Sequence, residues 1–341
     1  MTCFCPITGW RSAHGKTPDG KWPVVFNISE GLRDFEVKVP CGQCIGCRLD
    51  KSLDWAGRCI QESTLWEHNY FLTLTYDDER TPVKSFQDPS FCYRTDRPDD
   101  GGLIPLHLTL FWKRLRKSVF APLNSEDLLA GGLGRQPVYE IVDGKRTLVN
   151  SIRYFASGEY GDKGGRPHYH AIVFNLDIPD LLYYGMGSDG SPLFRSAWLE
   201  RIWGHGNVII GSVTAESAGY VARYTTKKIY GDPAADYYGT RLPPFSRCSN
   251  RPGIGFNWFI KNREDIERLG FVLINGKKHS VPRYYLDKLF KLNKKAYFDY
   301  KAKRAIIAKK AESSLDNEQS RLIARREAKE YTAKALKRTF E

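Results

Sequence analysis

The sequence predicts a domain of the α+β class, and three observations lead to this expectation. Residues 70–76 are rich in aromatic and β-branched residues that alternate along the segment, which is typical of a β-strand. Residues 151–156 and 168–174 have the same character and are separated by a Gly-rich turn, so they predict a β-hairpin. Residues 106–120 place apolar side chains at helical spacing and therefore predict an amphipathic helix.

The composition indicates a globular protein with a polyanionic partner. Apolar residues make up 41% of 341 residues, enough for a sizeable core in one large domain or two smaller ones. The chain has no run of eighteen apolar residues and no secretory signal at its start, so we expect neither export nor membrane insertion. The net charge of +13 indicates nucleic acid as the partner, although general solubility would also explain it. The 8 cysteines fit a reducing cytoplasm better than a secreted disulfide scaffold.

The first forty residues are rich in Gly, Pro and Cys and lead into Cys41, Cys44 and Cys47, after which residues 49–60 have a helical pattern. Short Cys-x-x-Cys spacings suit a tetrahedral structural zinc site, and plain reduced thiols explain them as well. The fourth zinc ligand would be Cys3, Cys5 or Cys59. An iron–sulfur cluster is disfavoured, because a lysine stands where the next cysteine would fall.

Basic residues lie on two of the expected helical segments. The helix over 106–120 carries Lys113 and Arg114 on its polar side, where they are either solvated or in contact with phosphate. A later helix over 218–229 has a plausible N-cap in Thr214 and is ended by Gly and Pro. The last 51 residues hold 15 Lys and Arg against 7 Asp and Glu, which predicts a basic tail that is helical or partly disordered.

Two histidines and one glutamate are candidate ligands of a catalytic metal. Side chains two apart on a strand face the same side, so His168 and His170 can share one divalent ion through neutral imidazoles. Pairing of the two hairpin strands would bring the Glu159 carboxylate back toward His168. Two imidazoles and one carboxylate with open positions suit a metal that also binds substrate oxygen. Two ordinary hydrogen-bonded histidines and a solvated glutamate are the alternative.

Tyr220 and Tyr224 lie four residues apart on the later expected helix, so they share a face, which Lys227 and Lys228 continue. Such a pair is more often core packing than chemistry. A phenol with a pKa near 10 is a poor nucleophile at neutral pH unless a metal or a cation stabilises the developing charge. The neighbouring lysines supply such a cation.

Several motifs in order resemble the HUH endonucleases, specifically the replication initiators of microviruses and most closely their gokushovirus branch. The resemblance spans roughly residues 40–285. The motifs that carry it are Pro40-Cys-Gly-Gln-Cys-Ile-Gly-Cys-Arg48, Phe71-Leu-Thr-Leu-Thr75, Lys113-Arg-Leu-Arg116, Gly158-Glu-Tyr160, Arg166-Pro-His-Tyr-His170, Tyr220-Val-Ala-Arg-Tyr-x-x-Lys-Lys228 and Arg251-Pro-Gly-Ile-Gly255.

The resemblance implies a central antiparallel sheet of the RNA-recognition-motif kind, with both histidines on a middle strand and Tyr169 facing the core. It further implies a site-specific endonuclease and strand transferase that starts rolling-circle replication. His168, His170 and Glu159 would hold Mg or Mn at the scissile phosphate while Tyr220 or Tyr224 attacks and becomes joined to the DNA 5′ end. The partners would be single-stranded or supercoiled phage origin DNA and the replication helicase and polymerase of a bacterial host, in whose cytoplasm the protein would work.

From these motifs we expect a Cys-rich segment over 1–60, an endonuclease core over 61–235, a family-specific extension over 236–290 and the basic tail over 291–341. Positively charged residues inside and beside the motifs are candidate DNA contacts: Arg166, Arg223, Lys113, Arg114 and Arg251.

Other function classes explain less of the sequence. A noncatalytic binder of single-stranded nucleic acid would stack bases on exposed Phe71, Tyr76 and Tyr154, but this leaves the tyrosine pair unexplained. A relaxase or transposase of the same nuclease class stays open, although the flanking motifs argue against it. A two-histidine phosphoesterase fails because its two His-x-Ser/Thr motifs are incomplete, and no P-loop ending accompanies Gly253 and Gly255.

Overall fold

The structure is a computed structural model of the whole chain. It describes residues 3–77, 102–122, 132–142, 145–161, 165–187, 190–214, 217–219, 221–222, 233–312, 315 and 318–335. The chain forms two compact units, of which the smaller comprises residues 1–51 with 298–337 and the larger comprises residues 52–297 with 338–341.

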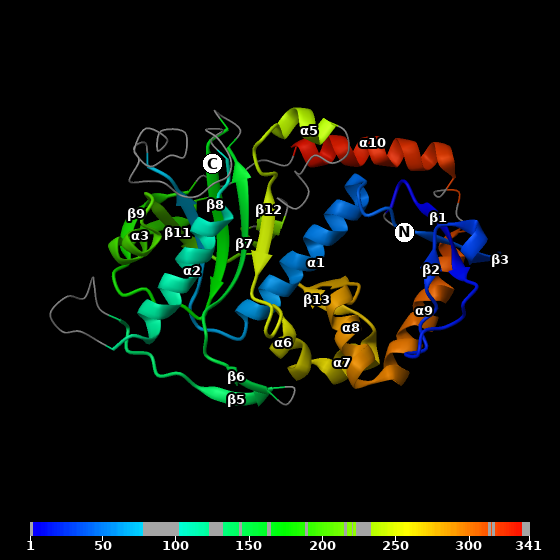
Figure 1. Cartoon of the computed structure of the whole chain (residues 1–341), viewed down its shortest axis with the longest axis horizontal. Helices are drawn as coiled ribbons and strands as arrows, with labels where there is room; N and C mark the ends of the chain where they lie inside the picture. The colour runs from blue at the N-terminus through cyan, green and yellow to red at the C-terminus, as the bar shows by residue number, and fades with distance from the viewer. Residues whose placement is uncertain are drawn as a thin grey trace. The chain divides into compact units, whose positions relative to one another are not determined.

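A seven-stranded antiparallel sheet is the centre of the larger unit (Figure 1). Its strand order is β12-β7-β8-β4-β11-β10-β9. In that order the strands span Phe245–Cys248, Arg153–Tyr160, Pro167–Phe174, Asn69–Thr75, Val208–Ser212, Pro192–Arg195 and Leu182–Met186. The expected hairpin is therefore present as β7 and β8, but β7 begins two residues later than predicted and continues through Tyr160.

The central part of this sheet has a βαββαβ connection. Along the chain the order is β4, α2 (Pro105–Phe120), β7, β8, α3 (Ala197–Trp203) and β11. The spatial order β7-β8-β4-β11, with every neighbour antiparallel, is that of ferredoxin-like and RNA-recognition domains. The predicted α+β class with a central antiparallel sheet is confirmed. Strands β9 and β10 before α3, and β12 after β11, widen the sheet at its two edges, and the sequence did not predict them.

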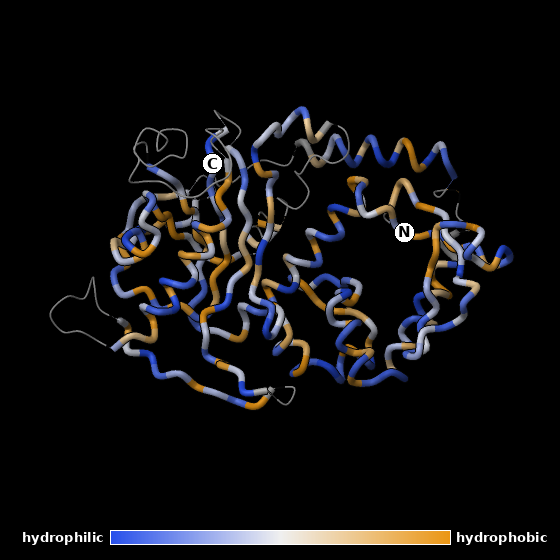
Figure 2. The backbone as a smooth tube through the Cα atoms, in the orientation of Figure 1, coloured by the Kyte–Doolittle hydropathy of each residue, from blue (hydrophilic) through white to orange (hydrophobic). Residues whose placement is uncertain are grey.

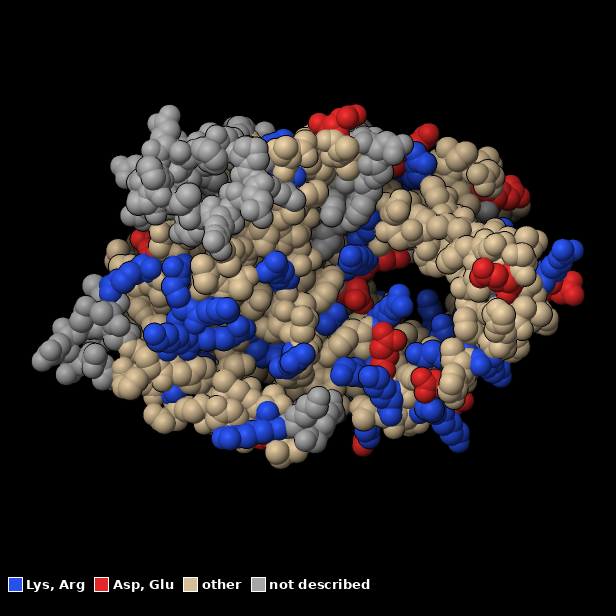
Figure 3. All heavy atoms as spheres, viewed as in Figure 1, with Lys and Arg blue, Asp and Glu red and all other residues tan. Residues whose placement is uncertain are grey.

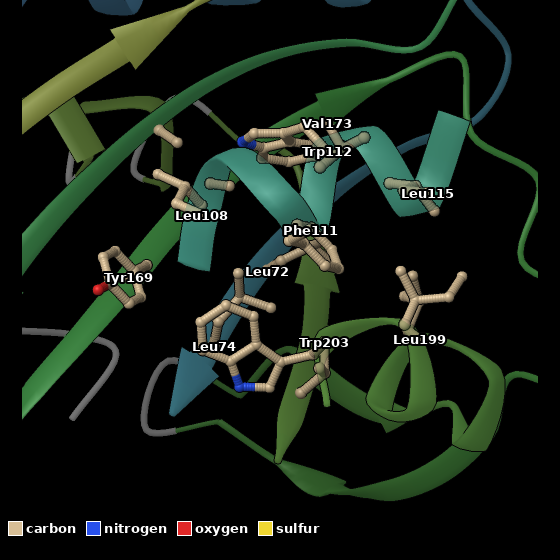
Figure 4. Close-up of a cluster of buried hydrophobic side chains, with 14 of the residues drawn as sticks. Leu72, Leu74, Leu108, Phe111, Trp112, Leu115, Tyr169, Val173, Leu199 and Trp203 are labelled. Carbon is tan, nitrogen blue, oxygen red and sulfur yellow. The ribbon is translucent and has the colours of Figure 1, made fainter. Parts of the chain in front are cut away.

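Helices α2 and α3 cover one face of the sheet through a large apolar core. Leu108, Phe111 and Trp112 of α2 point toward Leu72 and Leu74 of β4 in Figure 4. Their spacing of three and four residues puts them on one stripe of the helix. Full burial of each such side chain stabilises the fold by about 1.5–3 kcal/mol, which fixes α2 on the sheet.

The opposite face of the sheet carries a second core. Phe71, Phe155 and Ile172 project from the strands, and residues of α1 (Ile45–Ser63) and of the helical segment 217–222 pack on them. Side chains alternate along a strand, so this second face is also the one toward which the odd-numbered residues of β4 and β7 and the even-numbered residues of β8 point.

Thr214 caps the helical segment that follows it, as the sequence predicted. The backbone N–H of Ser217 donates to Thr214 Oγ1 at 3.1 Å, and the N–H of Thr214 donates to Ser217 Oγ at 2.8 Å. Each side chain thus satisfies a backbone donor of the other, which is the logic of a capping box with serine in place of glutamate.

The part of the larger unit after the sheet strands is held by a buried ion pair. Glu62 of α1 is fully buried and accepts hydrogen bonds from Arg153 Nε at 2.6 Å and from the backbone N–H of Gly255 at 2.7 Å. The Arg251–Gly255 motif is thereby fastened to α1 and β7. The remaining elements are β5 (Tyr139–Val142), β6 (Lys145–Leu148), α5 (Pro233–Tyr238), α6 (Phe256–Lys261), α7 (Arg263–Leu269), β13 (Val272–Ile274), β14 (Lys277–His279) and α8 (Arg283–Leu292).

The smaller unit contains a three-stranded sheet in the order β2-β1-β3, which the sequence did not predict. Its elements are β1 (Ile7–Ser12), β2 (Val24–Val25), the short 3-10 helix η1 (Ile28–Glu30), β3 (Gly31–Val39), most of α9 (Lys294–Glu312) and α10 (Gln319–Ala335). The described part of the basic tail is therefore helical, and α10 has long hydrophilic stretches, drawn blue in Figure 2. Within the described residues, no helix is long and apolar enough to cross a membrane.

Candidate metal centre

The hairpin β7–β8 brings three potential metal ligands to one face of the sheet. His168 and His170 are two apart on β8, the strand that lies between β7 and β4. Glu159 of β7 is the direct register partner of His168, as pairing of the hairpin strands predicts, and Ser157 is the partner of His170. The local strand register alone therefore determines how these side chains meet.

The three side chains converge on one point. Glu159 Oε1 lies 2.8 Å from His168 Nε2 and 2.9 Å from His170 Nε2. The two imidazole rings are 4.9 Å apart and nearly perpendicular, at 87°. Glu159 and His170 are each 2% exposed, whereas His168 keeps 13% of its side-chain surface exposed. One side of the group is thus closed, and His168 marks the side open to solvent.

Contacts behind the histidines fix how the rings are presented. His168 Nδ1 lies 3.1 Å from the backbone oxygen of Arg166, which can only accept, so this nitrogen carries the ring proton. In the neutral ring the Nε2 lone pair then points at the Glu159 carboxylate, a contact that a cation between the two atoms would make favourable. His170 Nδ1 lies 3.1 Å from the Thr73 hydroxyl. Such outer partners are typical of metal-binding histidines.

Glu159 carries its charge at neutral pH. Burial alone raises the pKa of this carboxyl group, but the contacts with His168 and His170 outweigh burial and lower the pKa to about 2. The group therefore offers one anionic oxygen and two imidazole nitrogens, all three within 4.8 Å of one another. This set fits a divalent ion that keeps positions open for water or for phosphate oxygen.

Two residues beside the ligands were not predicted from the sequence. Thr73 of β4 is the register partner of His170 and holds its ring, and Ser157 of β7 is fully buried on the same face. The Ser157 hydroxyl has no hydrogen-bond partner among the described residues, so it remains available to a ligand or water at this site. Strand alternation already placed Thr73 on the correct face, but only the pairing of β4 with β8 reveals its neighbour.

The helical segment 217–222 lies on the face that carries the three ligands. Ala218, Val221 and Ala222 belong to the same buried cluster as Phe71, and Phe71 also stacks on His170 with a ring separation of 5.6 Å. The residues expected to perform the covalent chemistry on this helix lie outside the described part of the chain, namely Tyr220, Arg223, Tyr224, Lys227 and Lys228.

The structure does not gather the other predicted DNA contacts around this group. Lys113 and Arg114 lie on α2, which covers the opposite face, and Arg114 Nη2 donates to the Trp203 carbonyl at 2.7 Å. Arg166 donates to the carbonyl of Tyr76. Arg251 is exposed, as is Lys113. Lysine and arginine atoms, drawn blue in Figure 3, gather in the part of the view where Figure 1 shows α2.

The aromatic residues required by the noncatalytic alternative are not available for stacking. Phe71 is 3% exposed and Tyr76 is 1% exposed. Tyr154 is half-buried, with its ring stacked on Trp112 at 4.0 Å. The expectation that these three side chains are exposed was wrong, because each of them packs against one of the helices that cover the sheet.

The predicted cysteine group is present in the smaller unit. Cys41, Cys44 and Cys47 lie together with Cys3, and all four sulfur atoms are within 4.8 Å of one another. Cys5 is exposed, and Cys59 is buried in the core of the larger unit. Of the three candidates for the fourth position, Cys3 is therefore the one that joins the group.

Comparison with known proteins gives concordant matches. Residues 138–229 match a family model of replication-associated proteins of the ORF2 type. The replication-associated protein VP4 of Bdellovibrio phage phiMH2K is 32% identical over 91% of this chain and 84% of its own length. The replication-associated protein ORF2 of Spiroplasma virus 4 is 34% identical over 80% of this chain and 74% of its own, and ORF4 of Chlamydia phage 1 is 27% identical over 76% and 56%. No solved structure matches significantly.

Proposed function

Because this chain belongs to the replication-associated proteins of microviruses, we propose that it is a replication initiator that nicks single-stranded origin DNA through a tyrosine. The observation that carries the proposal is the convergence of Glu159, His168 and His170 on one point. The helical residues that flank Tyr220 pack on the same face of the sheet, in a cluster that shares Phe71 with His170.

Glu159, His168 and His170 would hold Mg or Mn, whose charge, when bound, polarises the scissile phosphate. Thr73 and the Arg166 carbonyl keep the two rings turned so that their Nε2 atoms face the Glu159 carboxylate. The open side at His168 admits the phosphate. The buried side at His170 excludes water from behind the ligands, which strengthens the electrostatic interactions in the site.

The covalent step exchanges one phosphodiester for another. The phenolic oxygen of Tyr220 or Tyr224 attacks phosphorus in line as its proton is lost to solvent, and the bond from phosphorus to the 3′ oxygen breaks. The 3′ oxygen leaves with a proton as a free hydroxyl, and the 5′ phosphate stays joined to tyrosine. Lys227 and Lys228 would stabilise the negative charge that develops, and Arg223 would bind the DNA backbone.

The second tyrosine allows the strand to be closed again. The phosphotyrosine ester keeps the free energy of the broken bond, so a later attack by the new 3′ hydroxyl rejoins the strand without ATP. We propose that the first free 3′ hydroxyl primes a host polymerase, with a host helicase opening the duplex. The basic tail would add phosphate contacts, so its deletion should weaken DNA binding and reduce the salt dependence of that binding.

A covalent-adduct experiment tests the proposed function. The full chain is incubated with Mn and with labelled single-stranded oligonucleotides that tile the genome of the phage that encodes it, and adducts are resolved by denaturing electrophoresis. We expect an adduct that requires metal, persists in Tyr220→Phe and in Tyr224→Phe, and disappears in the double variant. Tyr237→Phe, at an exposed tyrosine of α5, is the matched control and should keep the adduct.

The same gel separates the alternatives. A missing adduct together with tight, metal-independent binding of the oligonucleotides would favour a noncatalytic binder. An adduct on DNA that lacks the phage origin, with transfer to a second duplex, would favour a relaxase or transposase of the same class. Retention of the adduct in the double tyrosine variant would refute the assignment of the nucleophile.

A further inference from the structure

We propose that Cys3, Cys41, Cys44 and Cys47 form a closed structural zinc site that joins the start of the chain to the first turn of α1. This site does not depend on the proposed nuclease function, because it lies in the smaller unit and uses other residues. The local spacing of the last three cysteines indicated such a site, and the structure identifies Cys3 as the fourth ligand.

The sulfur positions match a single tetrahedral ion. With a Zn–S distance of about 2.3 Å, two ligands of a tetrahedral site are about 3.8 Å apart. Cys3 Sγ lies 3.7 Å from Cys41 Sγ and 3.9 Å from Cys44 Sγ. A disulfide would require about 2.05 Å, and a cluster of several irons would spread the sulfurs further apart. The four thiols therefore surround a space suited to one ion.

Backbone amides are directed at the sulfurs, as thiolate ligands require. The N–H groups of Gln43 and Cys44 point at Cys41 Sγ at 3.4 and 3.3 Å. The N–H of Phe4 points at Cys44 Sγ at 3.4 Å, and that of Cys41 at Cys3 Sγ at 3.3 Å. Gly42 has a φ of +75°, in the left-handed region that favours glycine, and this turn lets the two following amides face one sulfur. Amide donors stabilise negative sulfur and so favour metal binding.

The sheet of the smaller unit explains how a cysteine 38 residues away reaches the knuckle. Strands β1 and β3 are antiparallel, and their register pairs Ile7 with Val39. Cys3 precedes Ile7 by four residues and Cys41 follows Val39 by two, so both leave the sheet at the same end. Cys44 stands immediately before α1, and Cys47 lies in its first turn. Zinc would thus hold the sheet end and the helix start together.

The burial of the group fits a structural role. Cys3 is 3% exposed and Cys47 is 9% exposed, and all four ligand positions of a tetrahedral zinc would be filled by protein sulfur. Catalytic zinc sites keep one position open, whereas structural sites are closed. The contrast with the two-histidine group, which leaves positions open, is the reason we assign no chemistry to this site.

Metal analysis of the full chain tests the proposal. The His168→Ala/His170→Ala variant serves as the background, so that any bound metal can be attributed to the cysteines. In this background we expect about one zinc per chain by elemental mass spectrometry, and loss of most of it in Cys3→Ser and in Cys41→Ser. Cys5→Ser, the same substitution two residues from Cys3, is the control and should keep the zinc. A background protein without zinc, or one that holds stoichiometric iron instead, would overturn the proposal.

Cobalt exchange guards against a variant that merely misfolds. Replacement of zinc by Co²⁺ should give the visible absorption of tetrahedral cobalt with sulfur-to-cobalt charge-transfer bands. Cys3→His offers a nitrogen ligand at the same place, so it should retain metal and show weaker charge-transfer bands. Unchanged cobalt spectra in Cys3→His, or equal changes in Cys5→His, would show that Cys3 is not a ligand.

Discussion

Two histidine pairs occupy opposite faces of the same sheet and differ in what surrounds them. His168 and His170 meet edge to face at 87° and converge on the Glu159 carboxylate. His107 of α2 and His205 after α3 stack in parallel, with ring centres 4.0 Å apart and exposed fractions of 2% and 3%. Among the described residues, the first pair belongs to a group of potential metal ligands and the second does not.

The comparison shows that burial and proximity of histidines do not make a metal site. His107 faces the Tyr76 hydroxyl at 2.8 Å, within an aromatic environment. Burial lowers the pKa of His107 to about 3, with further contributions from His205 and Arg114, so this ring is neutral and serves packing. The first pair differs through one anionic oxygen and through outer contacts that direct both Nε2 atoms to one point.

The largest expected effect is the loss of chemistry at the first pair. His170→Ala should lower metal-dependent adduct formation on the order of 10³-fold, because a metal ion contributes several kcal/mol to the stabilisation of charge at phosphorus. The matched variant His107→Gln, at the second pair, should leave the rate within about threefold. Rates are measured from single-turnover time courses with saturating Mn. Equal losses in both variants would mean that the distinction between the pairs is wrong.

A smaller effect is expected from the hydroxyl behind His170. Thr73→Val removes the partner of Nδ1 and should weaken Mn binding about 10- to 100-fold, as loss of outer contacts does at other metal sites. The Mn dependence of adduct formation and calorimetric titration both report this affinity. Thr73→Ser should restore it.

Thr75→Val is the control for that change. Thr75 is two residues further along β4, and its hydroxyl donates to the Asn207 carbonyl at 3.4 Å. We expect its substitution to leave Mn affinity unchanged. A hydroxyl-independent affinity at position 73 would indicate that strand pairing alone orients His170.

The second histidine pair predicts a dependence of stability on pH. The native pKa of His107 lies well below its ordinary value of 6.5. Below pH 6.5 the unfolded chain therefore binds a proton that the native chain does not, and stability falls as the pH falls toward 3. Between pH 7 and pH 5 this group should cost about 2 kcal/mol. Urea unfolding of wild type and His107→Gln measures it, since the variant should lose less stability over this interval. The exposed His14→Gln should behave as wild type, and identical pH profiles for His107→Gln and wild type would contradict the prediction.

Sequence reasoning succeeded where the geometry is local. Glu159 and His168 are joined by one hairpin, so strand alternation and pairing were enough to place them together. The pairing of Tyr76 with His107 and the stacking of His107 on His205 depend on the packing of two helices on a sheet, and no short pattern records it. Cys3 reaches the other cysteines through strands β1 and β3, which the Gly- and Pro-rich composition of this segment concealed.

The smallest expected effect concerns charge on the face that carries His107. Lys113 of α2 is exposed and free to contact phosphate, whereas Arg114 on the same helix donates to the Trp203 carbonyl and supports packing. Lys113→Ala should weaken binding of single-stranded DNA about two- to threefold and lower the salt slope by about one unit. It should not change adduct formation at saturating DNA, because Lys113 lies on the face opposite the metal ligands. Fluorescence anisotropy over a salt series measures the slope, with Lys277→Ala of β14 as a control for net charge alone. Equal effects of the two substitutions would show that α2 provides no phosphate contact, and a lower adduct yield at saturation would show that DNA extends across both faces of the sheet.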